Sequence, residues 1–548
     1  MVRPLIAASL PFLVQALDNG FGRTPIMGYN TYNDVGCSPN SSWVEQTMQA
    51  MQSKGLISLG YTYFGLDCGW ANPTRQANGS LTYDPLVFPN GIRPLADLAI
   101  SLSLHWSMYT DQGVYMCDTQ FTRRRPGSLN FEVQDALQFA GWNVKYMKVD
   151  NCFIEGAEQN APKDPRSDFP SRYSRMSNAL LNVGIKGINV CQWGVPQIDS
   201  SGLIGPSAWA PSLATSYRVS DDIARGWANV ARIANQAIHT SLLGLSAPGR
   251  FADLDMLEVG NPGMTFAEQQ THFAIWSTFK SALSIGTNIP SMSDQTLSIL
   301  SNRDLIAINQ DPLGEPVKLV QRFTGDYDIY QGNLANGDRA VLVYDQSNRA
   351  RSISFSFSAL GIQSATARDL YTGTSTTGAT SFSKSIPARG SIVLRLSAIR
   401  AVSASTPRVR YYPFPSGRLA GGANLQTCAG CSTGQKVGNI GAGANVTISG
   451  VRATATTMDV LFDYINCEIG YLADQGKNLR GATLSVNGGA AVTVEFPLTG
   501  YNWERDLLKG YKVRLSGFNT AGENTITVGA ATGVTTWAPD FDRIGVVG

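Results

Sequence analysis

Between about residue 22 and about residue 310, short apolar runs alternate with longer amphipathic stretches. The strand-like runs include 61–66, 105–109, 144–149 and 187–192, and the helix-like stretches include 42–54, 132–140, 172–183 and 221–239. This alternation predicts parallel strands joined by crossover helices. The region suits a (β/α)₈ TIM barrel, which typically needs about 250 residues. A doubly wound sheet is the competing architecture, but no Gly-x-Gly-x-x-Gly motif follows a strand.

The pattern changes after residue 314. Short alternating strands at 339–344, 352–357 and 391–396 predict a small antiparallel β domain. Residues 399–408 contain Ser, Thr and Pro and resemble a linker. Strands such as 460–464 and 483–486 then predict a second all-β module. We therefore expect an α/β chain with a barrel at 17–314, an antiparallel β-sandwich domain at 315–398, a linker at 399–408 and a β-sandwich module at 409–548.

Residues 1–16 have the pattern of a signal peptide. Arg3 supplies the positive charge, 5–13 are mostly apolar, and 14–16 end in a small residue suited to cleavage. A buried first helix is the alternative. Charged residues are 15% of the chain and the net charge is +2, which disfavours nucleic acid as a partner. No later run of about 20 apolar residues predicts a membrane span. We expect a secreted, extracellular protein.

Two further features agree with export. Asn40, Asn78 and Asn445 begin Asn-x-Ser/Thr triplets and are candidate glycosylation sites. The eight cysteines suit disulfides in an oxidising compartment, although the sequence alone does not fix their pairing. Cys428 and Cys431 have no second pair at zinc-binding spacing, so a structural zinc site is not expected.

One predicted strand ends in the segment 146–152, which reads Tyr-Met-Lys-Val-Asp-Asn-Cys. Alternate side chains of a strand share a face, so Lys148 and Asp150 point the same way. At the carboxyl end of a barrel strand that face looks into the active site. A carboxylate beside a lysine is placed to stay ionised, as a nucleophile must. An interior ion pair without chemistry is the alternative.

Other predicted strands also end in polar or aromatic residues. Asp67, Tyr109 and the pair Gln192 and Trp193 lie at the ends of three of them. Carboxylates accept hydrogen bonds from sugar hydroxyls, and aromatic rings cover the apolar face of a pyranose. Each residue alone could equally be a packed aromatic or a cap. Their coincidence at several strand ends favours a sugar site.

Glycoside hydrolysis needs a second carboxylate that carries a proton. The segment 218–223, Arg-Val-Ser-Asp-Asp-Ile, offers Asp221 and Asp222, and spacing does not choose between them. Either could instead cap the helix-like stretch that follows. With three histidines, no His-rich motif and no Gly-x-Ser-x-Gly elbow, zinc and serine hydrolases lose support. We expect neither a metal nor a cofactor.

The chain resembles glycoside hydrolase family 27, the α-galactosidase family, over about residues 21–397. The resemblance rests on ordered motifs at 23–30 (RTPIMGYN), 88–91 (FPNG), 126–128 (PGS), 147–152 (MKVDNC), 255–261 (DMLEVGN) and 306–314 (IAINQDPLG). It implies a (β/α)₈ barrel followed by an antiparallel β domain, as the periodicity does.

The resemblance also assigns roles. It implies that Asp150 is the nucleophile and that Asp222, four residues after Arg218, is the acid/base. Arg218 and Lys148 resemble the family's ligands of sugar hydroxyls. Residues at the positions of its galactose pocket are Tyr29, Asp67, Tyr109, Gln192 and Trp193. Its active-site disulfide corresponds to Cys117 with Cys152, and its N-terminal disulfide to Cys37 with Cys68.

Three departures bear on the substrate. Many members have two consecutive aspartates that hold the 4- and 6-hydroxyls, but here Cys68 follows Asp67. Gln192 stands where a Glu is common, and Tyr29 where a pocket Trp is usual. A β-L-arabinopyranoside has the galactose ring stereochemistry without the hydroxymethyl arm. An unpaired buried polar group costs about 1–3 kcal/mol, enough to shift the preference between these two sugars.

Residues 410–548 resemble family 35 carbohydrate-binding modules. The matching segments are 431–441, 486–489, 524–526 and 538–544. Many such modules bind calcium through acids near the first strand, but 409–412 reads Val-Arg-Tyr-Tyr, so we expect no calcium site. Trp537 and Asn524 are candidate sugar contacts, and each could instead be structural.

The sequence therefore predicts a retaining exo-glycosidase that releases terminal α-D-galactose from galactose-containing oligo- or polysaccharides through a covalent glycosyl-enzyme. We expect Asp150 to be ionised beside Lys148 and Asp222 to be held protonated. A β-L-arabinopyranosidase using the same site is one alternative. A catalytically silent sugar-binding protein is another, and a purely structural wall protein is more remote.

Overall fold

The computed structural model describes residues 17–156, 166–192, 197–200, 202–322, 327–402, 409–468 and 479–547. The predicted signal peptide, Trp193 and residues 403–408 of the predicted linker lie outside the described residues. Within these described ranges, no helix is long and apolar enough to cross a membrane.

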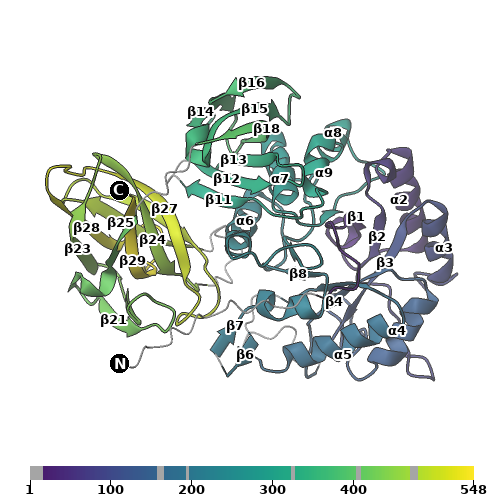
Figure 1. Ribbon diagram of the computed structural model, residues 1–548. Helices are drawn as coiled ribbons and strands as arrows, with labels where there is room; N and C mark the ends of the chain where they lie inside the picture. Colours follow the sequence, from purple (N-terminus) through teal and green to yellow (C-terminus); the bar gives the residue numbers. More distant parts are fainter. Residues whose placement is uncertain are drawn as a thin grey trace, which may run out of the picture.

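The first part of the chain forms a parallel eight-stranded barrel (Figure 1), as the periodicity predicts. Its strands, in the order 10-1-2-3-4-5-8-9, are β1 (Met27–Asn30), β2 (Tyr63–Leu66), β3 (His105–Asp111), β4 (Tyr146–Asp150), β5 (Gly187–Val190), β8 (Ser216–Arg218), β9 (Phe251–Asp253) and β10 (Leu283–Ile285). A parallel bridge between Leu257 and Ile285 joins the two ends of this order. A small antiparallel hairpin, β6 (Gln197–Asp199) and β7 (Gly202–Ile204), follows β5.

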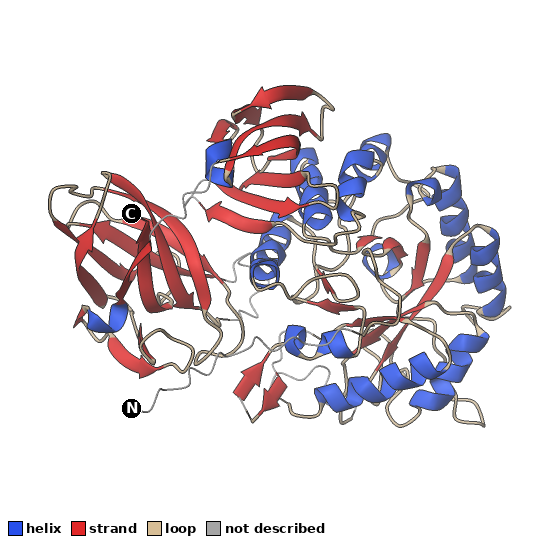
Figure 2. Ribbon diagram, viewed as in Figure 1, coloured by secondary structure: helices blue, strands red, loops and turns tan. Residues whose placement is uncertain are grey.

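Helices surround the barrel strands (Figure 2). The helices are α1 (Tyr32–Val35), α2 (Ser41–Ser53), α3 (Arg93–Ser101), α4 (Glu132–Gly141), α5 (Phe169–Asn182), α6 (Trp227–Leu242), α7 (Phe266–Thr278), α8 (Asp294–Leu300) and α9 (Arg303–Asn309), with 3₁₀ turns η1 (Ile57–Leu59), η2 (Pro206–Ala208) and η3 (Ala210–Ser212). The four predicted amphipathic stretches correspond to α2, α4, α5 and α6. The stretch predicted at 221–239 begins later, because Gly226, not an aspartate, is the residue before the first turn of α6.

A β domain follows the barrel and packs against it. Its main sheet has the order 11-12-13-18-15-16 and a separate pair is β14 with β17. The elements are β11 (Lys318–Arg322), β12 (Tyr327–Asn333), β13 (Arg339–Asp345), β14 (Arg351–Ser356), η4 (Phe357–Leu360), β15 (Ile362–Asp369), β16 (Ser375–Ala379), β17 (Ser381–Ile386) and β18 (Ser391–Ala401). Tyr330, Leu342 and Tyr344 belong to the same buried apolar cluster as the barrel. The barrel and this domain are therefore joined by a continuous apolar cluster, and the domain has a second cluster of its own that includes Ile329, Val341 and Ile353.

The C-terminal module is a separate two-sheet sandwich, seen as the yellow-green lobe of Figure 1. One sheet has the order 21-22-29-24-27, with β19 on β29, and the other 20-23-28-25-26. The elements are β19 (Val409–Pro413), η5 (Phe414–Ser416), β20 (Arg418–Ala420), β21 (Asn424–Thr427), β22 (Gln435–Gly438), β23 (Asn445–Arg452), β24 (Thr457–Ile465), β25 (Leu479–Val486), β26 (Val492–Pro497), β27 (Leu508–Ser516), β28 (Glu523–Ala530) and β29 (Asp540–Val547).

The two residues suggested as sugar contacts of this module differ. Trp537 is 42% exposed. Asn524 is buried, and its side-chain amide donates to the carbonyl oxygens of Val451 and Asn519. Asn524 therefore holds loops of the module together, so its suggested role as a sugar contact is wrong.

Three disulfides occur among the described residues. Cys37 is bonded to Cys68 and Cys117 to Cys152, the two pairs that the family resemblance implies, and Cys428 is bonded to Cys431. Cys191 and Cys467 are buried thiols. The pairs Cys37–Cys68 and Cys117–Cys152 lie beside the carboxyl ends of the barrel strands, where they fix loops of the candidate site.

Candidate active site

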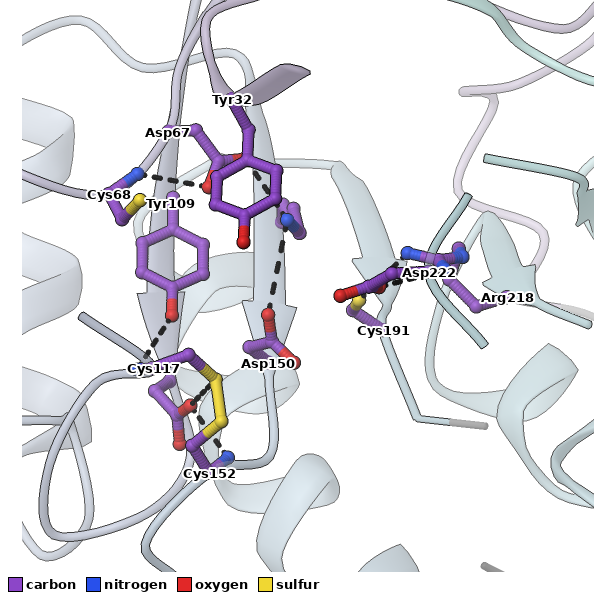
Figure 3. A network of polar contacts seen from close by, with 12 residues as sticks. Tyr32, Asp67, Cys68, Tyr109, Cys117, Asp150, Cys152, Cys191, Arg218 and Asp222 are labelled. Carbon is purple, nitrogen blue, oxygen red and sulfur yellow. Dashed lines mark hydrogen bonds and ion pairs between the residues drawn. A yellow bond between two sulfur atoms is a disulfide. The ribbon is translucent and has the colours of Figure 1, made fainter. Parts of the chain in front are cut away.

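The end of β4 carries the first two charged groups of the site. Tyr146, Lys148 and Asp150 alternate along the strand, and Tyr146 and Lys148 line a small cavity of about 50 Å³ inside the barrel. The Lys148 ammonium lies 3.9 Å from Asp150 Oδ2 and 3.0 Å from Asp67 Oδ2. The lysine therefore forms ion pairs with both carboxylates, Asp67 and Asp150, which are labelled in Figure 3. Spacing predicted that Lys148 and Asp150 share a face, but the shorter contact of Lys148 is with Asp67.

Asp67 follows β2 and is almost fully buried. Its Oδ2 accepts hydrogen bonds from the Lys148 ammonium and from Asn30 Nδ2, the latter at 2.8 Å, and its Oδ1 accepts from the backbone of Cys68. The disulfide from Cys68 to Cys37 ties this strand end to the loop after β1. These contacts orient Asp67 and keep it beside a cation, because a buried carboxylate needs such partners.

A second group of contacts fixes the loop that follows the end of β4. The hydroxyl of Tyr109, on β3, accepts a 3.0 Å hydrogen bond from the backbone of Cys117. The neighbouring Asp111 accepts from the backbone of Gly113 and from that of Cys152, two residues after Asp150. The Cys117–Cys152 disulfide joins the same two loops. Asp150 is therefore held by a rigid frame, which preorganises its carboxylate.

The opposite side of the opening is formed by Arg218, at the end of β8, and by Asp222 (Figure 3). One guanidinium nitrogen of Arg218 lies 3.0 Å from Asp222 Oδ1 and 2.7 Å from Asp255 Oδ2. Arg218 is buried, whereas 66% of the Asp222 side-chain surface is accessible. The buried arginine thus presents an accessible carboxylate to the opening.

Asp222 lies in a loop rather than at a helix end. Its backbone carbonyl accepts a 3.0 Å hydrogen bond from Arg232, and the amide of Ile223 donates to Asp255. The alternative that Asp221 or Asp222 caps the following helix is therefore wrong, because α6 begins only at Trp227. Asp255 was not singled out as a site residue in the sequence. Its contacts with Arg218 and Ile223 give it a clear part in placing Asp222.

Tyr29 does not line the opening, and its prediction as a pocket residue is wrong. Its ring packs against Trp43 and Phe64, and its hydroxyl donates to Asp34. Strand alternation explains this, because Asn30, the next residue, is the one that reaches Asp67. Tyr32 takes the place at the opening instead. It is 39% exposed, and the Lys148 ammonium lies 5.5 Å from the centre of its ring.

The surroundings of Tyr32 also show its central position (Figure 3). Burial raises the pKa of its phenol, and the charges of Asp222, Asp67 and Asp150 raise it further, whereas Lys148 lowers it. The ring of Tyr32 therefore borders the same opening as these four charged groups. A weak signal for Tyr32 in the sequence is its position two residues after the end of β1.

The end of β5 contributes Cys191 and Gln192. The side-chain oxygen of Gln192 accepts a 2.8 Å hydrogen bond from Asn151, the residue after Asp150. The Cys191 sulfur accepts from Arg218 at 3.4 Å. Gln192 is fully buried, and it contributes to the site by holding Asn151 in place. Trp193, predicted beside it, lies outside the described residues.

The surroundings of Asp150 and Asp222 shift the pKa values of the two carboxyls in opposite directions. These directions are the reverse of the expected ones. Burial raises the pKa of Asp150 to about 6; Lys148 opposes this shift, and Asp222 and Asp67 add to it. Enclosure in the mouth of the barrel also raises the pKa of Asp222, although most of its side chain is accessible. The charges of Arg218 and Lys148 outweigh that effect and leave the pKa of Asp222 below its usual value.

In the empty site the surroundings therefore favour the charged form of Asp222 more than that of Asp150, the opposite of the expected direction. Lys148 shares its charge with Asp67, whereas Asp222 has Arg218 close to it. Like charges repel, so the ionised carboxylate of Asp222 adds to the rise in the pKa of Asp150. The two carboxyls therefore titrate as a coupled pair, and their surroundings determine which of them holds a single proton.

Two groups of residues in the described part of the chain have the side-chain types that bind metals. One is Cys37, Cys68 and Asp118, and the other is Asp111, Cys117 and Cys152. In each group the two cysteine sulfurs are bonded to each other in a disulfide. The aspartate is therefore the one residue of each group that still offers a metal ligand. Thiolates, not disulfides, are the metal ligands of cysteine.

Two carboxylates that flank one opening, each beside a cation, are the groups with which a glycoside hydrolase breaks a glycosidic bond. The fold and the site place the chain in that class of enzyme. Comparisons with known proteins agree. The family model described as "Alpha galactosidase A" matches residues 30–311, and that described as "Alpha galactosidase C-terminal beta sandwich domain" matches 324–396. The chain belongs to the α-galactosidase family, glycoside hydrolase family 27.

Relatives and solved structures give the same picture. The protein described as probable α-galactosidase D of Aspergillus fumigatus is 30% identical, over 99% of this chain and 98% of its own. The crystal structure of α-galactosidase I from Mortierella vinacea is 29% identical, with a TM-score of 0.64, and covers 70% of this chain and 100% of that one. A family 27 β-L-arabinopyranosidase from Geobacillus stearothermophilus, 20% identical with a TM-score of 0.59 over 70% of this chain and 98% of its own, shares the fold.

Proposed function

We propose that the chain is a retaining exo-α-galactosidase in which Asp150 is the nucleophile and Asp222 the acid/base. The observation that carries the proposal is the placing of these two carboxylates at one opening, Asp150 on the Lys148 side and Asp222 on the Arg218 side. The names of its relatives support galactose as the sugar that is released. Its substrates are then galactose-containing oligo- or polysaccharides.

The reaction takes two steps. Asp150 attacks the anomeric carbon while Asp222 protonates the leaving oxygen, which breaks the glycosidic bond and forms a covalent galactosyl-enzyme. Asp222 then takes a proton from water, which attacks the same carbon and releases Asp150 and galactose with net retention. In the first step Asp222 must carry the proton of the pair while Asp150 is ionised.

The surrounding residues support the binding of one sugar ring. Asp67 and Lys148 present a carboxylate and an ammonium that suit neighbouring hydroxyls, and Arg218 adds a guanidinium. The centre of the Tyr109 ring lies 5.2 Å from the Lys148 ammonium, so Tyr109 borders the same pocket. We propose Tyr32 as the aromatic ring that covers the apolar face of the sugar. Gln192 supports this pocket through Asn151, and Trp193 is proposed to complete it.

A side-by-side assay of two aryl glycosides tests the choice of sugar. We expect kcat/KM for nitrophenyl α-D-galactopyranoside to exceed that for nitrophenyl β-L-arabinopyranoside. The missing second aspartate after Asp67 should narrow the gap to about 10-fold, since an imperfectly paired hydroxyl contributes about 1–3 kcal/mol. A higher value for the pentoside would reverse the assignment. Release of nitrophenol from neither would favour a silent sugar-binding protein.

The pKa of Asp150 predicts the shape of the pH profile. The active free enzyme holds one proton in the Asp150–Asp222 pair, and the last proton leaves as pH rises through about 6. We therefore expect kcat/KM to fall about 10-fold per pH unit above that value. It should fall again in more acid solution, where Asp222, with its lowered pKa, binds a second proton. A constant kcat/KM between pH 6 and 8 would contradict this account.

Several further features are part of the same proposal. We propose that residues 1–16 are removed on export and that Asn40, Asn78 and Asn445 carry glycans. Asn40 and Asn78 are exposed and Asn445 is half-buried, which is compatible with that role. The proposed domain limits remain 17–314, 315–398 and 409–548. We also propose that the last module binds glycan through the exposed Trp537.

A further inference from the structure

The β6–β7 hairpin is a short element at the rim of the active site. Its first strand begins five residues after Gln192, which bonds to the residue next to Asp150. The backbone of Ile198 donates a 3.1 Å hydrogen bond to the carbonyl of Arg166. Arg166 in turn forms an ion pair with Glu155, five residues after Asp150. The hairpin therefore borders the loop that follows the nucleophile.

This hairpin needs support from outside itself. Each of its strands has three residues, and two-stranded hairpins are marginally stable at best on their own. The bond from Ile198 to Arg166 holds one side. The other side rests on the C-terminal module, more than 290 residues further along the chain.

The contact with the module is close. A Cβ atom placed on Gly205, directly after β7, would lie 2.1 Å from the ring of Tyr501, and one on Gly202 would lie 2.8 Å from Asn502 Nδ2. Arg505 Nη2 donates a 3.3 Å hydrogen bond to the carbonyl of Leu203. The glycine at 205 has φ −84°, which any residue adopts, so what the position requires is the absence of a side chain. The ring of Tyr501 fills that space.

The module loop that makes this contact is itself rigid. Asp506 Oδ2 accepts hydrogen bonds from the backbones of Tyr501 and Asn502, at 2.7 and 2.8 Å. A second contact fixes the module as a whole, because Leu242 of α6 and Leu319 of β11 pack against its hydrophobic core. The module is therefore anchored at two separate places, and its loop is able to hold the hairpin in one position.

We propose that the C-terminal module is a fixed wall of the active site, in which Tyr501 and Arg505 position the β6–β7 hairpin against the sugar units of the leaving group. The inference rests on the proposed function. An exo-acting enzyme encloses the terminal galactose in the barrel, so the remainder of an oligosaccharide must pass over the rim. Tyr501 and Arg505 are positioning residues, and their effect falls on substrates with a leaving sugar.

The test compares two substrates that differ in the leaving group. In α-galactosyl fluoride the leaving group is one atom, whereas in raffinose it is a disaccharide. We expect Arg505→Ala and Tyr501→Ala to raise KM for raffinose about 3- to 10-fold, as loss of one contact allows. Their kcat/KM for galactosyl fluoride should stay within about twofold of the unaltered chain. Gly205→Ala, which clashes with Tyr501, should act in the same direction.

Two control variants make the outcome decisive. Arg514→Ala removes an exposed ion pair elsewhere on the module, and Gly141→Ala adds a methyl group in open space on α4; neither should change KM for raffinose. If Gly205→Ala does not fold, Arg505→Ala still decides the result. Equal losses on both substrates, or no loss on either, would overturn the inference. An unaltered chain that cleaves neither substrate would overturn the proposed function and the inference with it.

Discussion

Asp150→Asn is expected to lower kcat/KM for nitrophenyl α-D-galactopyranoside by on the order of 10⁴-fold or more, while the fold stays intact. The amide keeps the size of the carboxylate but cannot form the glycosyl-enzyme. Initial rates over a range of substrate concentrations measure the loss, and calorimetric titration with galactose measures retained binding.

The same variant carries its own control for folding. The pKa of Asp150 is raised in the folded chain, so its ionised form destabilises the fold at pH values above about 6. Asparagine removes that charge. The thermal midpoint at pH 7 should therefore be equal to or higher than that of the unaltered chain. Turnover within 10-fold of the unaltered enzyme, in a variant that folds normally, would remove Asp150 from the mechanism.

Asp222→Asn is expected to show a loss that depends on the leaving group. General acid catalysis contributes roughly 10²- to 10⁴-fold, and it matters most when the leaving oxygen is a poor one. We therefore expect a loss in kcat/KM in that range for raffinose and a loss under about 10-fold for α-galactosyl fluoride. The second step also slows, because no base assists the attack of water.

Azide distinguishes loss of the acid/base from general damage to the site. It attacks the glycosyl-enzyme without needing a base, so it should raise turnover of the fluoride by Asp222→Asn and yield α-galactosyl azide. Asp221→Asn is the matched control, because Asp221 directly precedes Asp222 and its side chain accepts a hydrogen bond from the backbone of Asp222. Equal losses on raffinose and the fluoride, without rescue by azide, would contradict the role of Asp222.

Much of the frame of the site could be predicted because it depends on local pattern. The alternation of strand and helix predicted the barrel, and the period of two along β4 placed Lys148 and Asp150 on one face. The choice between Asp221 and Asp222 came from the family resemblance alone. Asp222 is not the cap of α6, because the helix starts five residues later, at Trp227.

The parts that the sequence did not predict depend on contacts between distant segments. Tyr29 faces Trp43 rather than the sugar, and its role falls to Tyr32, because the chain turns directly after β1. The Lys148 ammonium lies closer to Asp67 than to Asp150, and Arg218 forms ion pairs with both Asp222 and Asp255. No spacing along the chain reveals how one cation is divided between two acids, so the sequence could not predict the directions of the two pKa shifts.

The contact of the C-terminal module with the hairpin is also beyond sequence reasoning. Taken alone, Gly205 is typical of a loop glycine and Tyr501 of a packed aromatic residue. Their close approach joins segments that are almost 300 residues apart.

Trapping of the glycosyl-enzyme tests the central claim most directly. A fluorinated galactosyl fluoride that slows the second step should leave one sugar bound to the chain, and mass spectrometry of its peptides should find it on Asp150. Attachment to Asp222, to Asp111 or to any other residue would contradict the account.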